Sequence, residues 1–155
     1  MAWVRCCGGS AKKQNVIYKD GVWNVGIDNP GSYTQQSWNT IGGTLQSDRF
    51  KFGPCGAQQI AALGTSNKFD FTNYSLLNVK CKGLTKYDSS HNTYGTVKLV
   101  STKTNYSSAQ VIPISKISST VEHTISIDVS SVSEAYLLFQ ADSGESSEVY
   151  EIWCQ

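Results

Sequence analysis

The sequence predicts an all-β protein, an antiparallel β-sandwich or jelly roll with roughly eight to ten short strands. Three observations lead to this prediction. Apolar residues recur with period two, as in Phe50-Lys51-Phe52 and at Ile125 and Ile127. Turn-forming groups such as Lys19-Asp20-Gly21 and Asp142-Ser143-Gly144 separate these runs. No sequence segment of useful length has apolar residues at helical spacing, and only 16% of the residues are charged.

The expected strands follow from the alternating runs. In chain order they contain Trp23, Phe50–Phe52, Leu77–Cys81, Val97–Leu99, Val111–Ile114, Ile125–Val129, Leu137–Ala141 and the C-terminal residues 146–155. Further turns are expected at Gly53-Pro54 and Lys82-Gly83, and one helical turn at Ser130–Glu134, capped by Ser131 or Ser133. The large side chains on the apolar strand faces form the predicted core: Trp23, Leu77, Val79, Leu99, Ile125, Ile127, Leu137, Phe139 and Trp153.

Residues 1–15 show no strand pattern, so we expect a non-regular N-terminal arm followed by the sandwich over residues 16–155. The arm would attach the domain to a partner or to other copies through Trp3, Val4, Cys6 and Cys7. No stretch approaches the roughly 18 apolar residues of a membrane span, and the N-terminus lacks the apolar core of a signal peptide. We therefore expect a protein made in a cytoplasm without membrane insertion.

Charge and cysteine usage exclude several classes of protein. Lys and Arg total 13 against 12 acidic residues, a net charge of +1 that predicts no nucleic-acid partner. Five cysteines in an unexported chain argue against a disulfide framework, and none lies near a His in sequence, so no zinc site is expected. Cys81 and Cys154 fit strand alternation as small core residues, whereas Cys6, Cys7 and Cys55 are left without a role.

Calcium is the one metal that the residue types allow. Carboxylates in loops, joined by backbone carbonyls, can bind Ca²⁺ without a recognisable motif. Asp20, Asp28 and Asp142 are the candidates, but turn chemistry explains each of them equally well. We expect no cofactor.

The residues that catalysis would need are missing or badly spaced. Only His91 and His123 could act as a base for a nucleophile, and His123 fits a strand end or the core. Glu148 and Glu151 are three apart on a strand, so their side chains should leave opposite faces and fail to flank one glycosidic bond. A non-enzymatic protein is predicted.

Aromatic residues in polar segments are the more informative feature. Segments 29–40 and 86–95 have no alternation that demands burial of their aromatic rings. Such rings suit the apolar face of a sugar, and neighbouring polar groups suit its hydroxyls. The predicted carbohydrate-binding residues are Tyr33, Trp38, Tyr87 and Tyr94 for stacking, with Asp88, His91 and Asn92 for hydrogen bonds. The alternative is that these aromatics only cover the ends of the sandwich.

Four sequence phrases resemble one family: MAWVRCCGGS, NVIYKDGVW, FDFTNYSLLNVKCKG and the long ending TISIDVSSVSEAYLLFQADSGESSEVYEIWCQ. The family comprises small structural proteins, and domains of tail proteins, in phages and prophages of Gram-positive gut bacteria. Its motifs correspond here to Phe69–Leu77, Ile127–Ser131 and Tyr150–Trp153. The resemblance implies a jelly roll related to carbohydrate-binding modules, placed on the outside of a virion and carrying no catalytic residues.

Two functions are compatible with these observations. The first is a virion surface protein that binds host or mucosal carbohydrate through loops at one end of the sandwich. The second is a purely structural virion component, such as a capsid decoration, head-fibre or tail protein, whose partners are all proteins. In both, self-association as a trimer is expected from the symmetry common in virion fibres, with release from the cell by lysis.

Overall fold

In the computed structural model, the described residues are 15–23, 40–41, 44–56, 60–65, 67–102 and 111–155. They form β-strands and no helix, and so none of them belongs to a helix that could cross a membrane. The strands are β1 (Asn15–Lys19), β2 (Val22–Trp23), β3 (Thr40–Ile41), β4 (Thr44–Leu45), β5 (Phe50–Phe52), β6 (Ile60–Gly64), β7 (Phe69–Asp70), β8 (Leu76–Thr85), β9 (Thr96–Val100), β10 (Val111–Lys116), β11 (His123–Asp128), β12 (Glu134–Asp142) and β13 (Ser146–Cys154).

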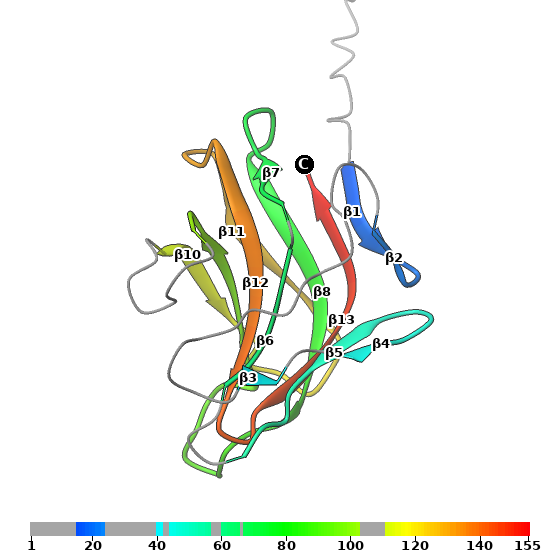
Figure 1. The fold of residues 1–155 in the computed structure, drawn as a ribbon, viewed down its shortest axis with the longest axis vertical. Coiled ribbons are helices and arrows are strands. Elements are labelled where there is room, and N and C mark those ends of the chain that lie inside the picture. The colour runs from blue at the N-terminus through cyan, green and yellow to red at the C-terminus, as the bar shows by residue number, and fades with distance from the viewer. Residues whose placement is uncertain (1–14, 24–39, 42–43, 57–59, 66, 103–110) are drawn as a thin grey trace, which may run out of the picture.

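The strands form two packed sheets (Figure 1). The seven-stranded sheet has the order β11-β8-β13-β1-β2, with β5 on β13 and β4 on β5. The six-stranded sheet has the order β10-β9-β12-β6-β3, with β7 on β12. All pairings among the described residues are antiparallel except that of β3 with β6. The predicted all-β antiparallel sandwich is confirmed.

The core lies between the two sheets. Six of the predicted core side chains are at most 3% exposed: Leu77, Val79, Leu99, Ile127, Leu137 and Phe139. The prediction is wrong for Trp23, Ile125 and Trp153, which are half-buried. Trp23 and Ile125 pack against the core from β2 and β11, and both strands lie at sheet edges, where one flank has no neighbouring strand. Trp153 alternates with two fully buried neighbours in β13 and therefore faces outward.

The two predicted hairpin turns are confirmed by backbone conformation. Asp20 and Gly21 have φ values of 49° and 76°, and they join β1 to β2. Ser143 and Gly144, with φ values of 37° and 86°, join β12 to β13. Positive φ at two successive positions gives the turn twist that matches a β-hairpin.

Two other predicted turns are wrong. Lys82-Gly83 lies inside β8. Glycine fits this position because the Tyr94 ring occupies the space that a Cβ would take. Ser130–Glu134 forms no helical turn: a hydrogen bond from Val132 N to Val129 O closes a tight turn, and β12 begins at Glu134. The expected caps, Ser131 and Ser133, do not cap this turn. Instead, Asp128 Oδ1 accepts the hydrogen bond from Ser130 N at 2.9 Å.

The arm prediction lies mostly outside the described residues. Trp3, Val4, Cys6 and Cys7 are not described, and neither are the candidate ligands Asp28, Tyr33 and Trp38. Asn15 belongs to β1, so the sandwich begins one residue earlier than expected. The side-chain amide of Asn15 donates a hydrogen bond to the Tyr74 hydroxyl at 2.8 Å, which joins the start of β1 to the segment before β8.

Candidate functional site

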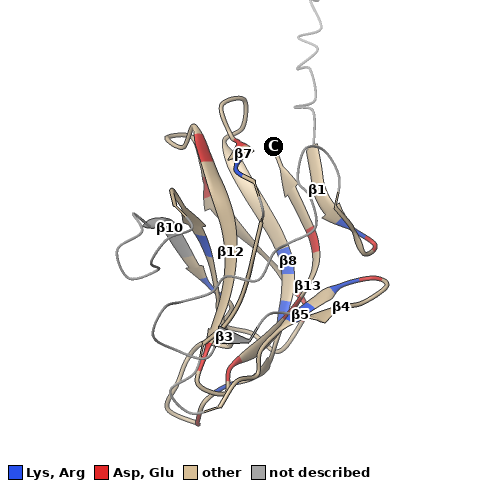
Figure 2. Ribbon diagram, in the orientation of Figure 1, with Lys and Arg blue, Asp and Glu red and all other residues tan. Residues whose placement is uncertain are grey.

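The outer face of the seven-stranded sheet carries two rows of charged side chains. Directly paired residues on neighbouring strands point to the same side of a sheet. Lys19, Glu151 and Lys80 form one row across β1, β13 and β8, and Lys51, Glu148 and Lys82 form the second across β5, β13 and β8. Figure 2 shows basic residues on β8 beside acidic residues on β13. The rows face outward because Cys81, between the two lysines of β8, is fully buried.

A β-bulge in β13 brings the two glutamates to this one face. The pairing with β8 shifts between Val149 and Glu151, so that Tyr150 is an extra residue in the strand. Val149 and Ile152 are therefore both fully buried although they are three apart. The prediction that Glu148 and Glu151 leave opposite faces is wrong for this reason.

Four of the six charged groups in the rows, those of Lys19, Glu151, Lys80 and Glu148, meet a group of opposite charge. Glu151 Oε1 lies 3.4 Å from Lys19 Nζ, and Lys80 Nζ lies 2.7 Å from Glu122 Oε1. Glu148 Oε2 lies 3.6 Å from the Arg49 guanidinium. Exposed pairs of this kind contribute little to stability, since water screens them. The rows therefore form a surface on which acidic and basic side chains alternate, without a large net charge.

Tyr150 joins the second row to the β4–β5 hairpin. Its hydroxyl donates a hydrogen bond to Glu148 Oε2 at 2.7 Å, and the Arg49 guanidinium lies 5.4 Å from the centre of its ring. Burial, together with the bond to Glu148, raises the pKa of Tyr150. The phenol therefore stays protonated and acts as a fixed donor.

The far end of this face carries Trp153. In register with it lie Val16 on β1 and Asn78 on β8, and Asn78 pairs in turn with Ser126 on β11. The Ser126 hydroxyl donates to Asn78 Oδ1 at 2.6 Å, whereas Asn78 Nδ2 is buried and has no hydrogen-bond partner. The two charged rows, with Tyr150 and Trp153, are called the sheet platform.

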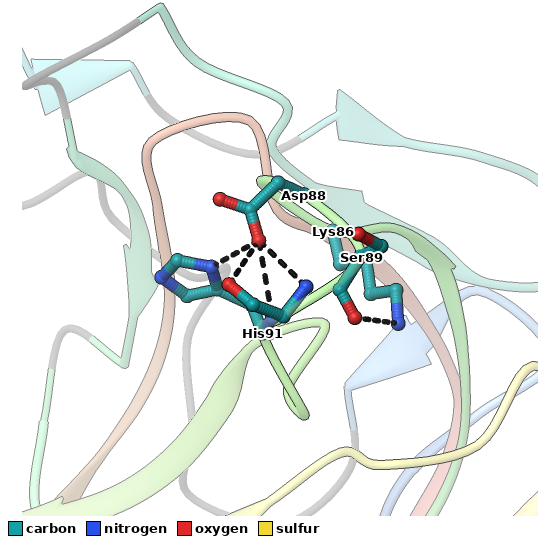
Figure 3. A network of polar contacts seen from close by, with 5 residues as sticks. Lys86, Asp88, Ser89 and His91 are labelled. Atoms are coloured by element: carbon teal, nitrogen blue, oxygen red, sulfur yellow. Dashed lines mark hydrogen bonds and ion pairs between the residues drawn. The ribbon is translucent and has the colours of Figure 1, made fainter.

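The loop between β8 and β9 gathers several of the predicted sugar-binding residues (Figure 3). Asp88 Oδ1 accepts bonds from Ser90 N at 2.8 Å and from His91 N at 3.2 Å, and it lies 2.9 Å from His91 Nδ1. The Ser90 hydroxyl also donates to Oδ1, and this bond lowers the pKa of Asp88 most, followed by the bonds from the His91 side chain and from Ser90 N. The Tyr87 ring meets the His91 ring edge-on, with centroids 5.1 Å apart, and Asn92 is exposed beside them.

Tyr94 takes a different position from the other loop residues. It is half-buried, packs against the core and covers Gly83 of β8. Its backbone N donates to Ile117 O at 2.8 Å, and Lys86 Nζ lies 6.0 Å from its ring centre. Tyr94 therefore anchors the end of the loop, and Tyr87 is the ring that the loop presents.

The turn below this loop holds a buried carboxylate. Glu145 is 5% exposed, and its Oε2 accepts a hydrogen bond from Asp142 N at 3.1 Å. Burial raises the pKa of Glu145, and the nearby charge of Asp142 adds to this effect. The hydrogen bond from Asp142 N acts in the opposite direction, and so do the charges of His91 and Lys116.

The thiols of the described residues are not positioned for chemistry. Cys81 and Cys154 are fully buried free thiols, as the alternation predicted. Cys81 Sγ lies 3.9 Å from His123 Nε2 across β8 and β11. The two residues are 42 positions apart, so the sequence did not indicate this contact. Burial raises the pKa of Cys81 to about 12, so it is no thiolate at neutral pH. Cys55 is also buried, and its Sγ donates to Ala141 O at 3.6 Å.

The candidate calcium ligands do not converge in the part of the chain that is described. Asp20 lies in the β1–β2 turn, whereas Asp142 ends β12 and accepts a bond from Gln140 Nε2 at 2.7 Å. The described residues contain no group of three or more His, Cys, Asp or Glu side chains that could hold a metal ion.

The fold is similar to that of known carbohydrate-binding modules. One solved structure, a variant of a family 29 module used to probe ligand recognition, aligns with a TM-score of 0.57 and 17% identity, covering 92% of this chain and 91% of that chain. A second family 29 variant aligns with a TM-score of 0.56 and 16% identity over 92% and 90% of the two chains. No protein-family model matches the sequence, and no curated protein matches it. At these identities the likeness concerns the fold, a jelly-roll-like β-sandwich.

Proposed function

We propose that this chain is a non-catalytic carbohydrate-binding module whose ligand lies on the sheet platform. The observation that carries the proposal is the arrangement on β13, where Tyr150 and Trp153 share one outer face with rows of alternating acids and bases. Aromatic rings bind the apolar faces of sugars, and fixed donors and acceptors bind hydroxyls. The likeness of the fold to carbohydrate-binding modules supports the same proposal.

The pairing of the platform acids supports binding over catalysis. Glu148 is held by Arg49 and by the Tyr150 hydroxyl, and Glu151 by Lys19. A glycosidase needs one carboxyl group with a raised pKa and a second free to attack or to activate water. Both glutamates are held by these partners, so neither stands free to attack or to activate water. They therefore suit hydrogen bonding to hydroxyls.

The wider setting is proposed from the sequence resemblance. We propose that the module sits on the surface of a phage virion, attached through residues 1–15, and that copies associate as trimers. In that setting weak single sites suffice, because many copies on one particle raise the overall avidity.

A purely structural virion component is the second candidate function. Val22 on β2 and Leu45 on β4 are 55% and 50% exposed, and both strands lie at edges of the seven-stranded sheet. The two hairpins touch, since a Cβ on Gly21 would meet the backbone of Ser47. Exposed apolar side chains on edge strands favour contact with another protein chain.

One binding experiment separates the two functions. Protein displayed at high copy number on beads is applied to an array of bacterial-surface and mucin glycans. We expect binding that Trp153→Ala weakens at least about tenfold, the loss of about 1.4 kcal/mol. Val121→Ala is the matched control, because Val121 is 71% exposed and belongs to neither charged row of the platform. Absence of binding to every glycan would favour the structural component.

A further inference from the structure

Tyr87 is the most exposed aromatic side chain in the described part of the chain. It is 52% exposed, and the other large apolar side chains with comparable exposure are aliphatic: Val22, Leu45 and Val121. The ring is therefore open to a ligand, and aromatic faces of this kind can stack on the apolar face of a sugar. It lies in the β8–β9 loop, at the opposite end of β8 from Asn78, with Lys82 of the platform five residues away. That separation is roughly 16 Å along an extended chain.

The exposed ring is held in place by fixed neighbours. Its edge-on contact with His91, at an interplanar angle of 79°, is secured because His91 Nδ1 lies 2.9 Å from Asp88. Thr85, just before the loop, donates to Gly144 O at 2.8 Å and lies 2.7 Å from the Ser146 hydroxyl. The loop is therefore already ordered, and ligand binding costs it little conformational entropy.

The polar groups beside the ring keep free binding capacity. All the hydrogen bonds that described residues donate to Asp88 go to Oδ1. Figure 3 shows the second carboxylate oxygen of Asp88, and Nε2 of His91, on the sides turned away from this network. A carboxylate oxygen accepts bonds from hydroxyl groups, whereas it repels anions. The matching ligand is neutral, with an apolar ring face bordered by hydroxyls.

We infer that the loop carrying Tyr87, Asp88 and His91 is a second ligand-binding site, separate from the sheet platform, that takes a single neutral pyranose ring. The ring face stacks on Tyr87, and hydroxyls donate to Asp88 and bond His91 Nε2. This site does not depend on the platform, because its contacts lie within one loop and its anchoring turn. A branched or chain-end sugar fits it, since only one aromatic ring is presented.

The test uses the full isotope-labelled chain and methyl pyranosides of glucose, galactose, mannose and N-acetylglucosamine as probes. We expect saturable shifts of the backbone amides of residues 86–94 with at least one probe, at millimolar affinity. Tyr87→Ala should weaken this binding about tenfold, and Tyr87→Phe should change it less than about twofold, because the ring is kept.

Two controls separate this site from the platform. Val121→Ala removes an apolar side chain that is more exposed than Tyr87 and should leave the loop shifts unchanged. Trp153→Ala should weaken platform binding at least about tenfold and leave the loop shifts intact. The inference is overturned if no probe shifts the loop amides at saturating concentration, if Tyr87→Ala binds as well as the wild type, or if Trp153→Ala removes the loop shifts together with those of the platform.

Discussion

The sheet platform and the β8–β9 loop assemble their polar groups in different ways. The platform joins residues far apart in sequence, as where Arg49 bonds Tyr150 across a separation of 101 residues. In the loop, Asp88 bonds residues two and three positions away. The platform therefore exists only when the strands pair in the correct register, whereas the loop network forms from a local segment. Substitutions that disrupt the core should therefore abolish the platform and leave much of the loop network intact.

The comparison is sharpest in β13, where buried and platform residues alternate. Ile152 is fully buried and Trp153, its neighbour, is half-buried on the outer face. We expect Ile152→Ala to cost about 2–5 kcal/mol of unfolding free energy, because it leaves a cavity in the core. Trp153→Ala should cost less in stability, and its effect should fall on binding. Urea unfolding of both variants measures the difference. A larger loss for Trp153→Ala would reverse our assignment of the strand faces.

A smaller effect is expected from the bond that ties Tyr150 to the platform. Tyr150→Phe removes the 2.7 Å hydrogen bond to Glu148 and keeps the ring beneath Arg49. The loss should be about 1 kcal/mol, since the pair is partly buried and a typical hydrogen bond contributes about that much to stability. Thermal unfolding measures it. Ser90→Ala removes a hydroxyl bond to Asp88 in the loop and is the matched control. A loss of several kcal/mol for Tyr150→Phe would show that the platform supports the fold.

Glu145 gives a smaller effect that depends on pH. Its folded-state pKa is raised by burial, so charging it opposes folding. The penalty is absent below the pKa of the unfolded chain, grows between that pKa and the raised folded-state pKa, and is full above the latter. Glu145→Gln should therefore raise the unfolding midpoint at neutral pH and leave it unchanged near pH 3. Calorimetry at both pH values tests this, and a midpoint that falls at neutral pH would contradict it.

Deletion of residues 1–14 should have the least effect on the sandwich. Asn15 and its bond to Tyr74 are kept, so the unfolding midpoint should match that of the full chain. If the arm attaches copies to one another, light scattering should show a trimer for the full chain and a monomer after the deletion. A full chain that is monomeric at micromolar concentration would end the proposal of self-association.

The conformation of several turns and the faces of two strands were predictable from the sequence. Asp20-Gly21 and Ser143-Gly144 form the expected hairpin turns, because positive φ selects such residues. Asp70 and Asp128 lie at turns beside strands, and each carboxylate accepts a bond from the backbone two residues later, at 2.9 Å, as short polar side chains do in turns. The strand faces of β8 and β12 also followed from simple alternation, which placed Val79 and Phe139 in the core.

What the sequence by itself determined is the class of fold, the turn chemistry and the aromatic loop at residues 86–94, since these depend on period-two patterning and on contacts between near neighbours. Only the tertiary structure decided the platform. The extra residue Tyr150 brings Glu148 and Glu151 to one face, and the Tyr94 ring packs against Gly83 inside β8, where a turn was expected. Bulges and ring packing depend on the strand opposite, and the identity of that strand is set by the whole chain.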